Sequence, residues 1–144
     1  MSLVFQTAMA GTTAENFKTF AEYLPAGNYS GHAATNPSIK CSVTVVNTAS
    51  GDIFVSVKNR YDEISHTIPI NKILADSGDV LVSKDDRFNY VYVTDYEGNP
   101  NYDSVSRETT IRVVKSSEVY QVSIKSRTTR YGKSFGSEAK CNLD

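Results

Sequence analysis

The fold is decided by residues 39–58, IKCSVTVVNTASGDIFVSVK, where apolar and polar side chains alternate on both sides of a polar turn. The apolar side chains recur at every second position: Ile39, Cys41, Val43 and Val45, then Ile53, Val55 and Val57. Such alternation is typical of a strand with one buried face. The stretch therefore predicts two strands, 39–46 and 52–58, joined by a short connection that makes them antiparallel neighbours.

The same pattern continues over the rest of the chain. It predicts six further strands, at residues 28–33, 63–70, 79–83, 87–94, 105–114 and 119–127. Residues 71–78 favour a helical turn instead, and Pro69 has to lie at an edge or a bend. Short polar turns between successive strands favour an antiparallel meander. We therefore expect an all-β fold, an antiparallel up-and-down barrel of about eight strands, with a β-sandwich as the alternative.

One short helix is expected before the first strand. Its apolar residues fall at helical spacing: Phe17, Phe20, Ala21 and Leu24. Thr13 is the predicted N-cap, followed three residues later by Asn16 rather than by the Glu or Gln of a capping box. The segment Pro25-Ala26-Gly27 is expected to end the helix.

Composition limits the function classes. A chain of 144 residues is long enough for one domain. A formal net charge of -1 argues against a dedicated nucleic-acid binder. Two histidines, two cysteines and none of the common catalytic motifs leave little material for an active site. We therefore expect a non-enzymatic protein without a cofactor and without a nucleic-acid partner.

The cysteines and the start of the chain suggest a compartment. Residues 1–10 end in Ala8-Met9-Ala10, a pattern that signal peptidase accepts, so we interpret them as a signal-peptide remnant or as added residues. Residues 11–144 are the expected single domain. In an exported protein Cys41 and Cys141 are expected to form a disulfide, the alternative being two buried free thiols. The predicted location is periplasmic or secreted, with no membrane span.

Two short motifs resemble the lipocalin and calycin family. Gly27-Asn28-Tyr29 stands where that family has Gly-x-Trp at the head of the first strand, and Thr94-Asp95-Tyr96 matches its Thr-Asp-Tyr between the sixth and seventh strands. The resemblance implies structural roles for these residues. It also implies that Arg127 or Arg130 packs over the first-strand aromatic ring, and that the barrel carries a small molecule.

Three aromatic residues, Phe88, Tyr90 and Tyr92, alternate along the sixth predicted strand. We expect them to line the barrel interior and to bind a small hydrophobic ligand. The leading hypothesis is thus a lipocalin-like carrier. The alternative is a periplasmic protein-binding module or inhibitor that contacts a protein partner through loops 47–52 and 95–104.

Charge is distributed unevenly. Residues 52–104 contain ten acidic and five basic residues, whereas residues 105–144 contain eight basic and four acidic ones. Cross-strand ion pairs explain this distribution, and a basic patch for an acidic partner is the alternative. Residues 95–103 offer a side-chain oxygen at every second position, as calcium sites do, but they lack the glycine and glutamate of an EF-hand. We interpret them as a polar loop and expect no metal site.

Overall fold

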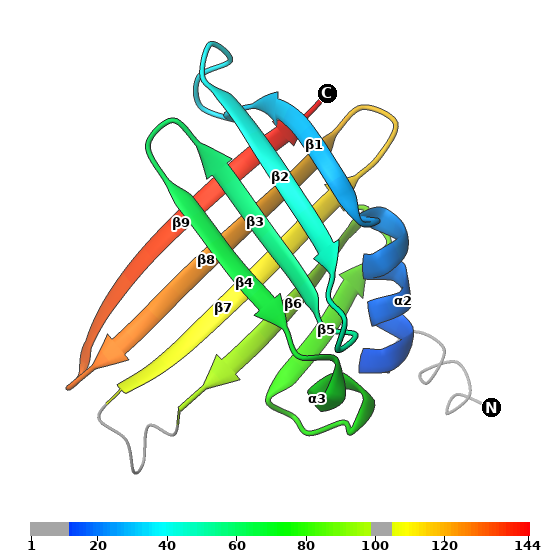
Figure 1. The fold of residues 1–144 in the computed structure, drawn as a ribbon, viewed down its shortest axis with the longest axis vertical. Helices are drawn as coiled ribbons and strands as arrows, with labels where there is room; N and C mark the ends of the chain where they lie inside the picture. Colours follow the sequence, from blue (N-terminus) through cyan, green and yellow to red (C-terminus); the bar gives the residue numbers. More distant parts are fainter. Residues whose placement is uncertain (1–11, 99–104) are drawn as a thin grey trace.

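The computed structural model describes residues 12–98 and 105–144, and its main feature is one antiparallel sheet (Figure 1). The strands are β1 (Gly27–His32), β2 (Lys40–Asn47), β3 (Ile53–Asn59), β4 (Glu63–Ile68), β5 (Val80–Asp85), β6 (Tyr90–Glu97), β7 (Val105–Lys115), β8 (Tyr120–Arg130) and β9 (Lys133–Leu143). Their order in the sheet is β4-β3-β2-β1-β9-β8-β7-β6-β5. The all-β prediction is therefore confirmed.

The sheet curls over the core but does not close. Figure 1 shows β1–β4 crossing in front of β6–β9, so that one continuous sheet covers both sides of the core. Strands β4 and β5 are its two edges and are not paired with each other. Pro69 follows β4 directly and is the N-cap of the short helix α3 (Ile70–Leu74). Because proline has no N–H to donate, the chain leaves the sheet here, and the expected closed eight-stranded barrel is not what the structure shows.

The ninth strand, β9, lies beyond residue 127, where the sequence pattern predicted no further strand. Strand β9 pairs with β8 along its whole length and with β1 at two positions, Gly31 with Leu143 and His32 with Asn142. It joins the two halves of the sheet. A period-two signal for this strand is present in the sequence, at Phe135, Ala139, Cys141 and Leu143.

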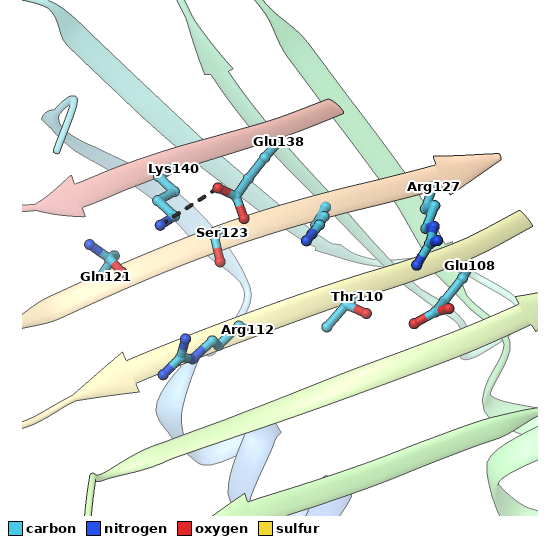
Figure 2. Close-up of a pocket in the computed structure, with 9 residues that line it drawn as sticks. Glu108, Thr110, Arg112, Gln121, Ser123, Arg127, Glu138 and Lys140 are labelled. Atoms are coloured by element: carbon cyan, nitrogen blue, oxygen red, sulfur yellow. Dashed lines mark ion pairs between the residues drawn. The ribbon is translucent and has the colours of Figure 1, made fainter. Parts of the chain in front are cut away.

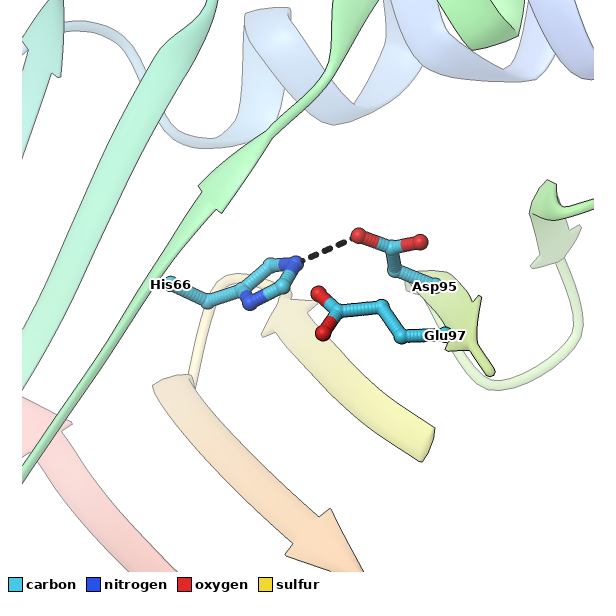
Figure 3. A group of neighbouring side chains, drawn as sticks. All are labelled: His66, Asp95 and Glu97. Atoms are coloured by element: carbon cyan, nitrogen blue, oxygen red, sulfur yellow. Dashed lines mark hydrogen bonds and ion pairs between the residues drawn. The ribbon is translucent and has the colours of Figure 1, made fainter. Parts of the chain in front are cut away.

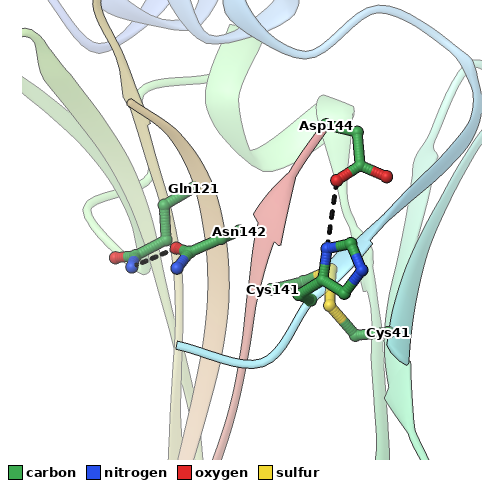
Figure 4. Close-up of a disulfide and its surroundings, with 6 residues drawn as sticks. Cys41, Gln121, Cys141, Asn142 and Asp144 are labelled. Carbon is green, nitrogen blue, oxygen red and sulfur yellow. Dashed lines mark hydrogen bonds and ion pairs between the residues drawn. A yellow bond between two sulfur atoms is a disulfide. The ribbon is translucent and has the colours of Figure 1, made fainter. Parts of the chain in front are cut away.

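A disulfide reinforces this short junction (Figure 4). Cys41 on β2 and Cys141 on β9 are bonded, with an Sγ–Sγ distance of 2.05 Å and a Cα–Cα distance of 5.7 Å. This confirms the predicted pairing. The bond reaches past β1, where Gly31 lies opposite Cys41. A Cβ atom at Gly31 would lie 1.9 Å from the carbonyl oxygen of Asn142, so only glycine lets β9 approach β1 this closely.

Helix α2 (Thr13–Tyr23) packs against β5 and β6 and supplies Phe20 to the core. Its N-cap is Thr12, one residue before the predicted Thr13. The Thr12 hydroxyl accepts from the Glu15 amide and the Glu15 carboxylate accepts from the Thr12 amide, which is the full capping box that the sequence pattern had missed. The Asn16 side-chain amide donates to the Val82 carbonyl at 2.9 Å and anchors the helix to β5.

The space inside the sheet is filled mainly by aliphatic side chains. The fully buried ones include Val43, Val55, Val91, Val113 and Ile124. Together with Phe20 and Leu24 of α2 and its C-terminal end they form one continuous cluster. Within the described ranges no helix is long and apolar enough to cross a bilayer. The predicted signal-peptide remnant, residues 1–10, lies outside the described residues.

Candidate binding site

The aromatic ladder, by which we mean Phe88, Tyr90 and Tyr92, lies on the outer face of the sheet. On β6, Tyr90 and Tyr92 alternate with Val91 and Val93, which are the buried ones, while Phe88 precedes the strand and is 62% exposed. The expectation that the three rings point into the interior is corrected by this placement. Period two requires that one set faces inward, and the compact, wholly apolar valines pack there, whereas the tyrosine rings keep their hydroxyl groups near water.

Neighbouring rings of the ladder lie close to each other, and two of them, Phe88 and Tyr90, also contact guanidinium groups. Ring centroids are 6.3 Å apart for Phe88 and Tyr90 and 5.8 Å apart for Tyr90 and Tyr92. The guanidinium of Arg112 lies 4.5 Å above the Tyr90 ring, and that of Arg87 lies 5.4 Å from the Phe88 ring. Such cation–π contacts hold the rings in place on the surface.

A basic depression lies beside the ladder on the same outer face (Figure 2). Its volume is about 340 Å³, and it is lined by side chains of β7, β8 and β9: Glu108, Thr110, Arg112, Gln121, Ser123, Lys125, Arg127, Glu138 and Lys140. The register of the sheet explains the grouping. Tyr92 is opposite Arg112 and Arg112 is opposite Ser123, so the ladder and the depression belong to the same rows of the sheet.

Positive charge exceeds negative charge in the depression. Four basic side chains face two acidic ones, and Glu138 is paired with Lys140 at 3.6 Å. For Arg112, Lys125 and Arg127, no carboxylate of residues 12–98 or 105–144 lies within ion-pair distance. Four of the eight basic residues in the last forty positions thus line this depression, and the two carboxylates opposite Lys125 and Arg127, those of Glu138 and Glu108, offset only half of the charge of these four.

A second depression continues the first toward the end of β6. Its volume is about 170 Å³ and its lining includes Tyr96, Gly98, Ser106 and Thr129. Glu108 and Arg127 line both depressions. The two are therefore parts of one groove that runs along the outer face and ends near residue 98. The predicted partner-binding loop 95–104 reaches this groove with residues 96–98. Residues 95–97 of it belong to β6, and residues 99–104 lie outside the described chain.

The residues that carry the lipocalin resemblance have other surroundings than the resemblance implies. Tyr29 packs edge-on against Tyr120, with ring centroids 6.1 Å apart. The cation over this pair is Lys115, 4.7 Å from the Tyr120 ring. Arg127 is on the outer face of β8, opposite Glu108, so it does not cover the first-strand ring. The pKa of Tyr120 is raised to about 12, first by burial and then by Tyr29 beside it.

Thr94-Asp95-Tyr96 lies inside β6, which extends to Glu97, rather than after it. Thr94 is on the outer face with the ladder, and its neighbour Asp95 is buried on the inner face. The carboxylate of Asp95 is hydrogen-bonded to the imidazole of His66 at 2.7 Å. The other histidine, His32, lies 3.1 Å from Asp144 on the surface. Neither histidine lines the groove.

Comparisons with known proteins give no relatives: no protein-family model, no curated protein and no solved structure matches this chain. Function is therefore inferred from the surface chemistry of the protein alone. Sequence reasoning missed the groove because its lining residues are spread over β7, β8 and β9. The available signal was the excess of basic residues after position 105, combined with the polar or charged residues at every second position of β7 (108, 110, 112) and of β8 (121, 123, 125, 127).

Proposed function

We propose that this protein is an exported, non-catalytic binding protein whose outer groove holds an acidic, extended segment of a partner protein. The observation that carries the proposal is the net positive charge of the first depression, where Arg112, Lys125, Arg127 and Lys140 outnumber Glu108 and Glu138. Guanidinium groups are the side chains best suited to carboxylates, because they can donate two parallel hydrogen bonds.

The shape of the groove favours an extended occupant. It is open to solvent and continues through two depressions. The side chains of Thr110, Gln121 and Ser123 in its wall can form hydrogen bonds with the backbone of an extended peptide. The aromatic ladder beside it offers rigid surfaces at low cost in conformational entropy, as is common in protein recognition. The disulfide supports export, because such bonds persist in oxidising compartments.

The carrier hypothesis stays a prediction, but the rings that suggested it face away from the interior. Val91 and Val93 occupy the inner positions of β6 instead. A displacement assay with a fluorescent fatty-acid probe tests it directly. Stoichiometric displaceable binding would favour the carrier, and its absence would leave the outer groove as the better site.

The proposed function is tested with a fluorescein-labelled peptide rich in Asp and Glu, measured by fluorescence anisotropy. We expect binding that weakens as salt is raised, because the attraction is between exposed charges. In the triple variant Arg112→Gln, Lys125→Gln and Arg127→Gln the affinity should fall at least about tenfold, as expected when two or three such contacts are lost.

The matched control removes the same number of charges elsewhere, at the exposed residues Lys18, Lys58 and Arg60. Substituting these three by Gln should leave binding within about twofold, since the groove is intact. Equal losses in the two triple variants would mean that only net charge matters. Tighter binding of a sulfated oligosaccharide than of the acidic peptide would reassign the groove to a glycan.

A further inference from the structure

A second cluster of polar side chains lies on the inner face of the sheet, between β4 at one edge and β6 near the other edge (Figure 3). His66 of β4 stands between Ile64 and Ile68 on the inner side of that strand, and Asp95 and Glu97 extend the inner row of β6. One ligand atom from each of the three, the imidazole nitrogen and an oxygen from each carboxylate, lies within 4.8 Å of the other two. Glu97 also lines the second depression of the outer groove, where its carboxylate has no cation within ion-pair distance among the described residues.

Burial of the Asp95 carboxylate and the His66 imidazole costs folding free energy, because charged groups lose their hydration. Asp95 is only 3% exposed, and the side chain of His66 is 12% exposed. Figure 3 shows the carboxylate of Asp95 directed at His66, with Glu97 beside them. One Asp95 oxygen, Oδ2, is hydrogen-bonded to His66, while the other, Oδ1, is buried and has no hydrogen-bond partner among residues 12–98 and 105–144. A buried carboxylate with one unpartnered oxygen is unfavourable, so the hydrogen bond to His66 compensates the burial of Asp95 only in part.

The charges lead to the same conclusion. Two carboxylates carry up to two negative charges, whereas one imidazole supplies at most one positive charge. Every Lys and Arg of the chain belongs to the described residues, and none lies within ion-pair distance of Asp95 or Glu97. A divalent cation bound to a neutral imidazole and two carboxylates would make the cluster neutral.

The geometry points to a divalent transition-metal site, with zinc as the representative ion, formed by His66, Asp95 and Glu97 where the two ends of the open sheet face each other. One nitrogen and two oxygens are a ligand set that zinc accepts, leaving a fourth position for water. Calcium prefers six to eight oxygen ligands, so this set of one nitrogen and two oxygens suits it less well. Tetrahedral zinc needs its ligand atoms about 3.4 Å apart, given arms of about 2.0 to 2.2 Å. The ligand atoms, which lie within 4.8 Å of one another, would have to approach further, and the exposed Glu97 side chain is free to move toward the other two.

The metal would act as a clasp. Strands β4 and β6 belong to opposite ends of the sheet and have no backbone pairing with each other. A metal bound by residues of both strands would hold the two ends of the sheet together on its inner face. The metal site does not rest on the function proposed for the outer groove, although Glu97 also lines the second depression.

The test uses the full chain, with its disulfide intact, after removal of metals by a chelator. Isothermal titration with zinc chloride should give one ion per chain. His66→Ala and Glu97→Gln should each weaken binding at least about tenfold, because even residues that only support metal ligands have effects of that size. Glu97 is exposed, so Glu97→Gln keeps the test valid if His66→Ala fails to fold.

The matched control is His32→Ala, which removes the other histidine and its contact with Asp144 but no residue of the cluster. It should bind zinc as the unsubstituted protein does. Zinc should also raise the melting temperature of the unsubstituted protein and not that of Glu97→Gln, since a ligand stabilises only the state that binds it. Cobalt(II) should give the intense visible absorption of a four-coordinate site.

Three results would overturn the inference. The first is absence of saturable one-to-one binding. The second is unchanged zinc affinity in Glu97→Gln. The third is zinc binding that leaves the melting temperature unchanged, because a clasp must stabilise the fold. If His66→Ala lowers stability in the presence of chelator while zinc does not bind, the cluster is a hydrogen bond between β4 and β6 and nothing more.

Discussion

The imidazole of His66 and the carboxylate of Asp95 lie 2.7 Å apart, although their strands stand at opposite ends of the sheet. This side-chain contact connects two parts of the sheet that no backbone hydrogen bonds join directly. Each end of the sheet therefore keeps one strand, β4 or β5, with backbone hydrogen bonds on one side only.

This arrangement predicts uneven protection against hydrogen exchange. Amides of β8, which is paired on both sides, should exchange most slowly, and amides of β4 and β5 that point away from their single neighbour should exchange fastest. Hydrogen exchange followed by mass spectrometry or NMR checks this. Uniformly slow exchange along β4 would show that β4 and β5 pair in solution.

The N-cap of α2 can be assigned by mutation. Thr12→Ala removes the side-chain acceptor for the Glu15 amide and should cost about 1 kcal/mol of stability. Thr13→Ala is the control, because Thr13 is the first helical residue and makes no capping bond in the described structure. Urea unfolding curves of the two variants give the comparison. A larger loss for Thr13→Ala would restore the assignment made from the sequence.

Gly31 is predicted to tolerate no side chain. In Gly31→Ala the new methyl group would meet the Asn142 backbone, so the β1–β9 junction must shift, and we expect a loss of about 1 to 3 kcal/mol. Gly136→Ala provides the control, because a Cβ there meets its nearest neighbour, the Ser126 carbonyl oxygen, at 3.7 Å. Equilibrium unfolding measures both. Similar stability of the two variants would contradict the close approach of β9 to β1.

The disulfide should account for a large share of the stability. Its cysteines are 100 residues apart, and removing a native bridge from a small exported domain costs about 2 to 5 kcal/mol. The double variant Cys41→Ala and Cys141→Ala should therefore unfold at lower urea concentration than the oxidised protein. Adding a reducing agent should destabilise the unsubstituted protein and leave the double variant unchanged. A reductant effect on both would point to another cause.

Tyr120 should make stability fall at alkaline pH. Its folded-state pKa is about 12, raised by burial and by Tyr29, against an ordinary value of 10.0. The folded protein thus keeps a proton that the unfolded chain releases, so this contribution is complete below pH 10 and declines as the pH rises from 10 to 12. Unfolding at several pH values checks the slope. Tyr120→Phe should lose it, and Tyr131→Phe, at an exposed position, should retain it.

The sequence predicts the strands well because alternation is a local property. Val43 or Val55 at every second position identifies a strand without knowledge of its neighbours. Which face is inside is a different question: on the sixth strand both the valines and the aromatic ladder alternate, and only packing decides between them. Similarly, His66 and Asp95 are 29 positions apart and meet only because the sheet curls. A usable signal existed, since His66 is a polar residue between Ile64 and Ile68, and Asp95 continues the row of Val91 and Val93.

The covalent link from β2 to β9 also governs how the protein responds to proteases. A single cut at any peptide bond between positions 41 and 141 produces two fragments that stay attached through sulfur. Such a nicked molecule would migrate as one species on a non-reducing gel and as two after reduction. In surroundings rich in hydrolytic enzymes, one cleavage event would therefore not release either piece of the domain.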